Sequence, residues 1–520
     1  MSKISNDHVF TLIKSLTRHE KRYFKVFATR HILEEEDNTY IKLYDIIDAL
    51  DVYDEEALIR DHAHEPFMKR FAMSKSRLYD MILKSLHSYH SSSSVDAELK
   101  KMLHLAEILF KKTLYRQCDR ILKKAKKLAE DHNKHTTMLE ITLWEKRIVE
   151  KDNYSGQDDE TIKEILRQDL KTIDLIQNYY TLWNLKSRFF LPLYKGGKAR
   201  SLEEKERFNK ILKHSLLQSE DMAISVEAKY LYHHIFSAHY FSIGDYEKSY
   251  RHMIRNLKII EDNYILFKEE PNTYFSILAN VIYIGNQLEH HQDVRGYFKK
   301  LKKFTSGLDM SDNRDLEMRI FNSMKSLELT IHVQKGEYNE ALEMLPEINE
   351  GLDRFSGKLS PLRKADFFFN IAITFFGLEQ YSDSLKYINR IINESKIDEN
   401  EDLFSFSKLL GIVIHFELGH YELVAYQAES TYRYLRKRNR VYKSENALIK
   451  FFKKVQNSPE LSHNMLRELR AELIELSQEP LERPSLEYFD FISWIDSKLD
   501  KLPFAQVVRQ RHDKSFDKSA

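Results

Sequence analysis

Residues 336–342 read GEYNEAL, and residues 244–250 read GDYEKSY. Both stretches place a glycine, an acidic residue, a tyrosine and, three residues after the tyrosine, a small side chain in the same order. The glycine can take the positive φ that ends a helix, and the tyrosine can cover the turn. The small residue lets the next helix approach closely. The two stretches therefore predict turns between paired antiparallel helices.

The segment around Gly336, LELTIHVQKGEYNEALEMLPEI, resembles a tetratricopeptide repeat (TPR), in which two helices meet at such a turn. From residue 246 onward, aligned copies recur every 40 to 48 residues, which is longer than the roughly 34 residues of a standard repeat. The 131 residues between the first two copies leave room for about two further helix pairs. The anchor residues of the six copies are Tyr115, Tyr246, Val294, Tyr338, Tyr381 and Tyr421.

This resemblance implies an all-α fold, a right-handed TPR-like superhelix of antiparallel helix pairs over residues 96–445. An irregular helical domain with recurring Gly-x-Tyr turns is the alternative. Composition agrees with a helical chain, because 520 residues contain only 13 glycines and 9 prolines, the usual residues of hairpins and strand ends. The small residues that recur together with the tyrosines favour the repeat.

Bulk charge and hydropathy restrict the kind of partner. The 81 basic and 80 acidic residues nearly cancel, so no global field attracts nucleic acid or anionic lipid. The longest apolar stretch, FFFNIAITFF at 367–376, has about half the length that spans a bilayer, and the amino terminus lacks the apolar core of a signal peptide. A single cysteine fits a reducing compartment. We expect a cytoplasmic, bacterial protein that does not bind membranes.

Residues 1–95 are predicted to form a separate helical module. Thr17-Arg18-His19-Glu20 matches a capping box, Asn38 can cap a following helix, and Ser74 or Ser76 can cap a third. SSSS at 91–94 is interpreted as a linker. The module can cover the first repeat, or it can be a helix-turn-helix that contacts phosphates through three basic residues. These are Lys75, Arg77 and Lys84.

Residues 446–502 are predicted to be C-terminal capping helices around a proline-bounded loop. The apolar residues of the last of these helices are expected to seal the last repeat, and residues 503–520, which lack an apolar period, to form a mobile tail. The sealing residues are Phe489, Phe491, Ile492, Trp494 and Ile495.

We find no arrangement of residues that predicts catalysis or a bound cofactor or metal. The 22 histidines form no HExxH and no paired Glu-x-x-His motifs. KGGKAR at 195–200 lacks the GxxxxGK[ST] pattern and is predicted to be a turn before a capping box, Ser201 to Glu204. Cys118 falls on a repeat's packing position. We therefore expect a protein without enzymatic activity.

The sequence predicts two candidate binding surfaces for a protein or peptide partner. The first is an aromatic groove on the concave face of the solenoid, made by first helices of the repeats, for which the alternative is that the same aromatic residues pack between successive helix pairs. The second is a basic patch in YRYLRKRNRVYK at 432–443, for which the alternative is a set of cations near a helix carboxyl end. The groove comprises His234, Phe241, Phe369, Asn370, Ile373, Phe376 and Phe416, and the patch comprises Arg433, Arg436, Lys437, Arg438 and Arg440.

The leading functional hypothesis is a non-enzymatic scaffold or adaptor that binds a partner peptide or helix in this groove. The alternative is a transcriptional regulator, in which residues 1–95 bind DNA and the repeats sense a peptide or protein. Nucleic acid is the less favoured partner, because acidic runs at 34–37 and 54–56 offset the basic residues of the module.

Overall fold

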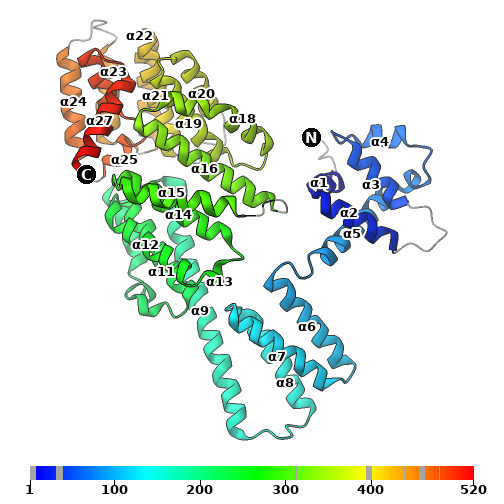
Figure 1. Cartoon of the computed structure of the whole chain (residues 1–520). Coiled ribbons are helices and arrows are strands. Elements are labelled where there is room, and N and C mark those ends of the chain that lie inside the picture. Colours follow the sequence, from blue (N-terminus) through cyan, green and yellow to red (C-terminus); the bar gives the residue numbers. More distant parts are fainter. Residues whose placement is uncertain are drawn as a thin grey trace. The chain divides into compact units, whose positions relative to one another are not determined.

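The computed structural model describes residues 7–30, 39–308, 310, 313–393, 401–438, 440–455, 463–479 and 481–519. Over these residues the chain is helical, with no strand, and successive helices pack in pairs (Figure 1). The all-α helical-repeat fold predicted from the sequence is therefore confirmed. The chain divides into two compact units, Met1–Asp174 and Leu175–Ala520, and none of the described helices is long and apolar enough to cross a membrane.

The first unit begins with a small bundle around Phe24, Tyr44 and Leu78, all of which are buried. The predicted capping box is formed, because Thr17 N–H donates to Glu20 Oε2 (2.8 Å) and Glu20 N–H donates to Thr17 Oγ1 (3.2 Å). The bundle contains α1 (His8–Ser15), α2 (Arg18–Arg30), α3 (Thr39–Ala49), α4 (Glu55–Asp61), a 3-10 helix η1 (Pro66–Arg70) and α5 (Phe71–Tyr89).

The other helix caps predicted for this bundle are either not formed or lie outside the described residues. The prediction that Ser74 or Ser76 caps a helix is wrong, because α5 already begins at Phe71 and both serines lie inside it. Asn38 and the acidic run at 34–37 lie outside the described residues.

The same unit continues with α6 (Val95–Lys111), α7 (Tyr115–Asp131) and α8 (His135–Lys151), which share a second apolar core. The last residue of SSSS caps α6, since Ser94 Oγ accepts from Ala97 N–H at 3.1 Å. Cys118 is fully buried and its Sγ contacts the Ala106 carbonyl at 3.3 Å, so the predicted packing role of this cysteine is confirmed.

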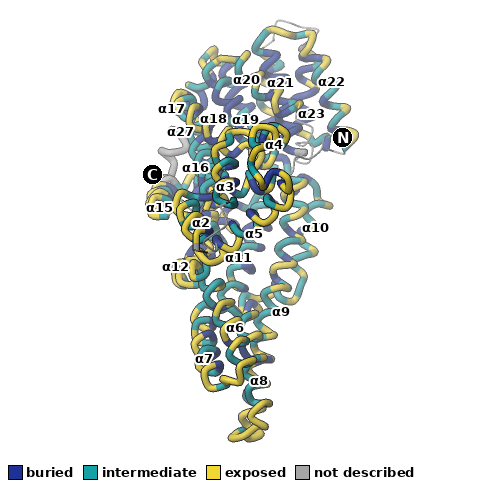
Figure 2. Tube along the Cα trace, turned by 90° about the vertical axis from the view of Figure 1, so that its right-hand side faces the viewer, coloured by how far each residue is buried: buried dark blue, intermediate teal, exposed yellow. Residues whose placement is uncertain are grey.

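The long helix α9 (Asp159–Gly196) crosses the boundary between the two units. In the second unit the helices pair in chain order, and buried residues are concentrated among α19–α23, where Figure 2 shows much dark blue. The helices up to the middle of the unit are α10 (Leu202–Leu212), η2 (Ser215–Leu217), η3 (Glu220–Met222), α11 (Val226–Ser242), α12 (Tyr246–Asp262), α13 (Tyr264–Phe267), α14 (Pro271–Gln287), α15 (His291–Ser306) and α16 (Arg314–Lys335).

The remaining helices of the second unit complete the repeats and carry the chain to its carboxyl end. They are α17 (Tyr338–Glu343), α18 (Leu345–Arg354), α19 (Pro361–Gly377), α20 (Tyr381–Asn393), α21 (Glu401–Glu417), α22 (Tyr421–Lys437), α23 (Lys443–Val455), α24 (His463–Ser477), α25 (Arg483–Leu486), α26 (Phe491–Asp500) and α27 (Phe504–Ser519).

The turns of the six aligned repeats share one backbone geometry, which also occurs at Asn133 between α7 and α8. In each, one residue is left-handed, its N–H donates to the carbonyl three residues earlier, and the next N–H donates to the carbonyl five residues before it. This pattern is a Schellman motif, and the second helix begins two residues after the left-handed position. The left-handed residues of the six repeats are Thr113, Gly244, Glu289, Gly336, Glu379 and Gly419, with φ between +60° and +77°.

The small residue of the motif lies at the crossing of the two helices, three residues after the second helix begins. Where this residue is Cys118, Ser249 or Ser384, its side chain donates to a first-helix carbonyl twelve residues earlier, at 2.7 Å for both serines. In the other three repeats Val294, Ala341 and Val424 occupy the position, and all six side chains are buried. The recurring small side chain therefore sets how closely paired helices approach.

Two features of the predicted repeat series need correction. In the third copy α15 begins at His291, so His291 takes the place of the tyrosine and Val294 takes that of the small residue. The gap between the first two copies does not hold two regular pairs. It holds α8, the 38-residue helix α9 and α10.

The segment predicted to be a mobile tail from residue 503 differs from that expectation. Residues 504–519 form α27, and Phe504, Val507 and Val508 are buried against α16 and α26. Phe504, Val507 and Val508 lie three and four residues apart, which brings them onto one face of a helix. The apolar period was missed because only the first turn of the segment carries it.

Buried ion pairs connect the turn after α9 to helices more than 200 residues later. Arg200 is 4% exposed. Its Nη2 donates to Glu445 Oε2 at 3.0 Å, and its Nη1 donates to Glu445 Oε1. Arg440 pairs with Asp402 at 2.6 Å and donates to the Gly196 carbonyl at 2.9 Å. KGGKAR is thus the expected turn, but its arginine is a structural residue that the sequence did not reveal.

We expect Ala341→Trp to destabilise the second unit, because Ala341 is fully buried at a helix crossing and overpacking costs about 1 to 3 kcal/mol or more. Glu340→Trp, at the exposed neighbouring position, is the matched control. Thermal unfolding followed by circular dichroism measures both. Equal melting temperatures for the two variants would contradict the assigned crossing.

Candidate partner-binding cleft

The chain's own carboxyl-terminal segment covers the aromatic positions predicted to form the groove. Phe376 is 1% exposed, and the rings of Phe489 and Phe504 lie edge-on to it at 5.1 and 5.3 Å between centroids. Phe416 is 5% exposed and meets Trp494 at 5.7 Å. The prediction that these two rings line an open groove is therefore wrong, because the face that carries them is already filled.

The other predicted groove residues do not form one site. Phe369 is buried against Tyr488, and the Asn370 side chain donates to the Asp366 carbonyl of its own helix. Both lie on α19, whereas His234 and Phe241 lie on α11.

The two residues on α11 have packing partners of their own. His234 packs between Phe190 and Tyr230, and burial lowers the pKa of His234 to about 4, so the imidazole is neutral at physiological pH. Phe241 packs beneath Lys198, whose ammonium lies 4.6 Å from the ring centroid. The aromatic rings that contact these two residues lie on α9, α11, α12 and α14, whereas Phe369 packs on the carboxyl-terminal segment, so the predicted groove residues do not share one set of contacts.

The predicted basic patch keeps four of its five members on the surface. Arg433, Arg436 and Lys437 are exposed on α22, and the Arg438 guanidinium stacks on Tyr434 at 4.0 Å from the ring centroid. Arg440 is buried and holds Asp402, so it cannot contact a partner, and its assignment to the patch is wrong.

An open cleft of about 700 Å³ lies beside the covered groove and includes one predicted residue, Ile373. One wall is formed by the carboxyl-terminal ends of the first helices α14, α16 and α19. The other wall is formed by the segment from Ser477 to His512. The volume falls in the range of small-molecule and peptide pockets.

Four amide side chains, those of Asn286, Gln287, Gln334 and Gln478, line the cleft together with its charged groups. Asn286 Nδ2 donates to Gln334 Oε1 at 2.5 Å, which ties α14 to α16, and Gln287 and Gln478 also line the cleft. An amide side chain offers both donors and an acceptor, which matches the alternating groups of a peptide backbone. The amides therefore suit a ligand that presents main-chain hydrogen bonds.

Ion pairs hold four of the charged side chains that line the cleft, Arg483, Glu487, Asp490 and Arg511. Glu487 accepts from Lys198 Nζ at 2.6 Å and from the Tyr246 hydroxyl, and Arg511 lies 3.0 Å from Asp490. Burial raises the pKa of Tyr246 well above its usual range, so its hydroxyl stays protonated and keeps donating to Glu487. Such a cleft offers little net charge to a ligand.

The floor of the cleft is apolar. Ile373, Tyr338, Phe489 and Phe504 form it, and each is at most 5% exposed. Burial raises the pKa of Tyr338 well above its usual range, so this residue behaves as an aromatic ring at neutral pH. The arrangement can accept an apolar side chain of a peptide whose backbone meets the amides.

The described residues contain no group of three or more histidine, cysteine or carboxylate side chains that could hold a metal ion. No protein family model matches the sequence, and no curated protein matches it. The cleft itself was missed from the sequence because its two walls are separated by more than 100 residues. The aromatic run EYFDFISW at 487–494 is the one signal that marks the second wall.

We expect Phe376→Ala to lower the free energy of unfolding by about 3 to 5 kcal/mol, because it opens a cavity among Phe489, Phe504 and Tyr381. Tyr426→Ala is the control, since Tyr426 is 66% exposed and a surface change should stay within about 0.5 kcal/mol. Urea unfolding measures both. A Phe376 variant as stable as the control would restore the open-groove hypothesis.

Proposed function

We propose that this protein is a non-enzymatic interaction scaffold of the TPR-like type, which binds an extended peptide of a partner protein in the amide-lined cleft. The resemblance of the Gly336 turn to a tetratricopeptide repeat supports the class, because repeats of this kind bind peptides through first helices. We keep the cytoplasmic and bacterial assignments as part of the same proposal.

One observation carries the proposal. Residues 487–490, which are not helical, lie across α19 and α21 with their aromatic side chains inserted between helices. Tyr488 stacks on Phe406 at 4.3 Å between centroids, and Phe489 packs on Phe376. The first-helix face thus already holds one non-helical aromatic segment of the chain, and the adjoining cleft continues that face with unfilled volume.

We expect a double variant, Gln287→Arg and Gln478→Arg, to lose the partner, because two long cations fill the cleft and remove its amides. The control is Gln117→Arg with Gln292→Arg, which changes the net charge equally at two exposed positions outside the cleft. Affinity capture with quantitative mass spectrometry identifies proteins that the wild type and control retain. Titration of the purified partner then measures its affinity.

A loss of affinity of about tenfold or more in the cleft variant alone supports the proposal. If both double variants retain the same proteins with equal affinity, the cleft is not the binding site. Melting temperatures of all three proteins separate lost binding from lost folding.

A DNA-binding N-terminal module is the second candidate, favoured by the exposed face of α5. Arg77 and Lys84 lie seven residues apart on this face, and Lys69 and Arg70 precede the helix. None of these four cations forms an ion pair among the described residues. The expected phosphate contact of Lys75 is wrong, because Lys75 is buried and paired with Glu55 at 2.5 Å.

For this second candidate we expect full-length protein to bind a fluorescein-labelled DNA duplex with an affinity that falls steeply as salt rises. Arg77→Glu with Lys84→Glu should remove that binding, whereas Lys100→Glu with Lys101→Glu, at exposed positions of α6, should not. Fluorescence anisotropy at several salt concentrations measures the effect. Equal weakening by the two double variants would mean that no specific face of α5 is used.

A further inference from the structure

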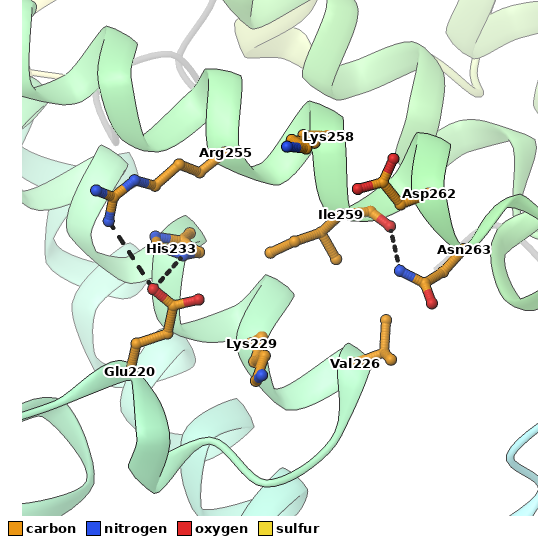
Figure 3. A pocket seen from close by; sticks show the side chains of 9 residues that line it. All are labelled: Glu220, Val226, Lys229, His233, Arg255, Lys258, Ile259, Asp262 and Asn263. Atoms are coloured by element: carbon orange, nitrogen blue, oxygen red, sulfur yellow. Dashed lines mark hydrogen bonds and ion pairs between the residues drawn. The ribbon is translucent and has the colours of Figure 1, made fainter.

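A second concavity lies in the second unit, between α11 and α12, and shares no lining residue with the cleft. Its volume is about 410 Å³, and η3 closes one side (Figure 3). Residues three to four positions apart on each helix face it, so two helix faces form its walls. The lining residues are Glu220, Val226, Lys229, His233, Arg255, Lys258, Ile259, Asp262 and Asn263.

A chain of hydrogen bonds fixes one wall of this depression. His233 Nδ1 lies 2.9 Å from His252 Nδ1, and His233 Nε2 lies 3.3 Å from Glu220 Oε2. Burial lowers the pKa of both histidines, to about 4 for His252, so both rings are neutral at physiological pH. A neutral ring donates from one nitrogen, so His252 donates to His233 and His233 donates to Glu220.

Glu220 is therefore held in place, and the Arg255 guanidinium lies 3.9 Å from the same oxygen. These two charges offset each other on one wall. The remaining charged groups of the depression are Lys229, Lys258 and Asp262, so the cations exceed the carboxylates by one.

Lys229 and Lys258 are exposed, and neither forms an ion pair among the described residues. They come from opposite helices, and in Figure 3 the side chain of Ile259 lies between them with Val226 to one side. Two ammonium groups beside an apolar floor match a ligand with a carboxylate next to an apolar side chain.

Exposed apolar residues flank the depression at both ends. Met222 and Ile224 precede Val226, and Tyr264 and Ile265 follow Asn263; each is 43% to 63% exposed. The first pair is held firmly, because Asn178 Nδ2 donates to the Met222 carbonyl and Asn178 Oδ1 accepts from Ile224 N–H. These exposed apolar side chains enlarge the apolar surface beside the depression, so a ligand can place more than one apolar side chain there.

We propose that this depression docks an acidic, amphipathic segment of a partner protein, with a carboxylate between Lys229 and Lys258 and apolar side chains on the flanking residues. The carboxylates of Glu220 and Asp262 disfavour nucleic acid here, because closely spaced phosphates would meet both of them. This site is separate from the cleft, so either can be tested without the other.

The test uses full-length protein and a panel of fluorescein-labelled peptides that alternate acidic and apolar residues at different spacings. Peptides with lysine in place of every acidic residue serve as the charge-reversed set. Fluorescence anisotropy at low and physiological salt measures affinity. We expect at least one acidic peptide to bind, its affinity to fall with salt, and the lysine peptides not to bind.

The variant Lys229→Glu with Lys258→Glu should weaken the acidic peptide about tenfold or more. Lys299→Glu with Lys303→Glu, two exposed lysines of α15 without ion pairs among the described residues, changes the net charge equally and should leave the affinity within about twofold. Ile224→Ser with Ile265→Ser should also weaken binding while leaving the charge unchanged. If Lys229→Glu with Lys258→Glu lowers the melting temperature below that of the wild type, Lys229→Gln with Lys258→Gln is measured in its place.

Three outcomes would overturn the proposal. They are no binding by any acidic peptide, equal weakening by the two lysine double variants, and tighter binding of a DNA duplex than of the peptides at the same site.

Discussion

The repeats of this protein depend on one backbone constraint, a single left-handed residue two positions before the second helix of each pair. The following N–H can reach the carbonyl five residues back only when that residue has positive φ. Glycine meets the constraint at Gly244, Gly336 and Gly419 without steric cost. Glutamate meets it at Glu289 and Glu379 at a cost of about 1 kcal/mol. The packing of the pair must compensate for that cost.

This constraint explains how far the sequence predicts the fold. The turns at Gly244 and Gly336 are visible because glycine, tyrosine and a small residue coincide there. At Glu289 the glycine and the tyrosine are both replaced, so alignment on residue types alone shifted the register by three residues. The turn geometry persists there because the helix crossing, with Val294 against Gly285, still requires it. The backbone conformation of the turn is therefore the same in all six repeats, whereas the residue types at the turn vary.

The candidate site was less predictable for a different reason. A repeat pattern places Phe376 and Phe416 on the first-helix face, but it does not say what covers that face. The covering residues, Phe489 and Trp494, lie 113 and 78 residues later in the chain. The same holds for Arg440. Its position in a basic run does not predict that it is buried and paired with Asp402. Contacts of long sequence separation decided both cases.

Ion pairs hold the second wall of the cleft in place. Its second wall is the segment around Glu487, which Lys198 and Tyr246 hold from the other side of the unit. Arg200 holds Glu445 and lies 3.8 Å from Glu482, whose carboxylate caps the first turn of α23. Removing one partner of such a buried pair costs about 3 to 5 kcal/mol, so the wall stays fixed in the free protein. A peptide that enters a cleft with a fixed wall does not have to order that wall. More of its contact energy is therefore available for affinity.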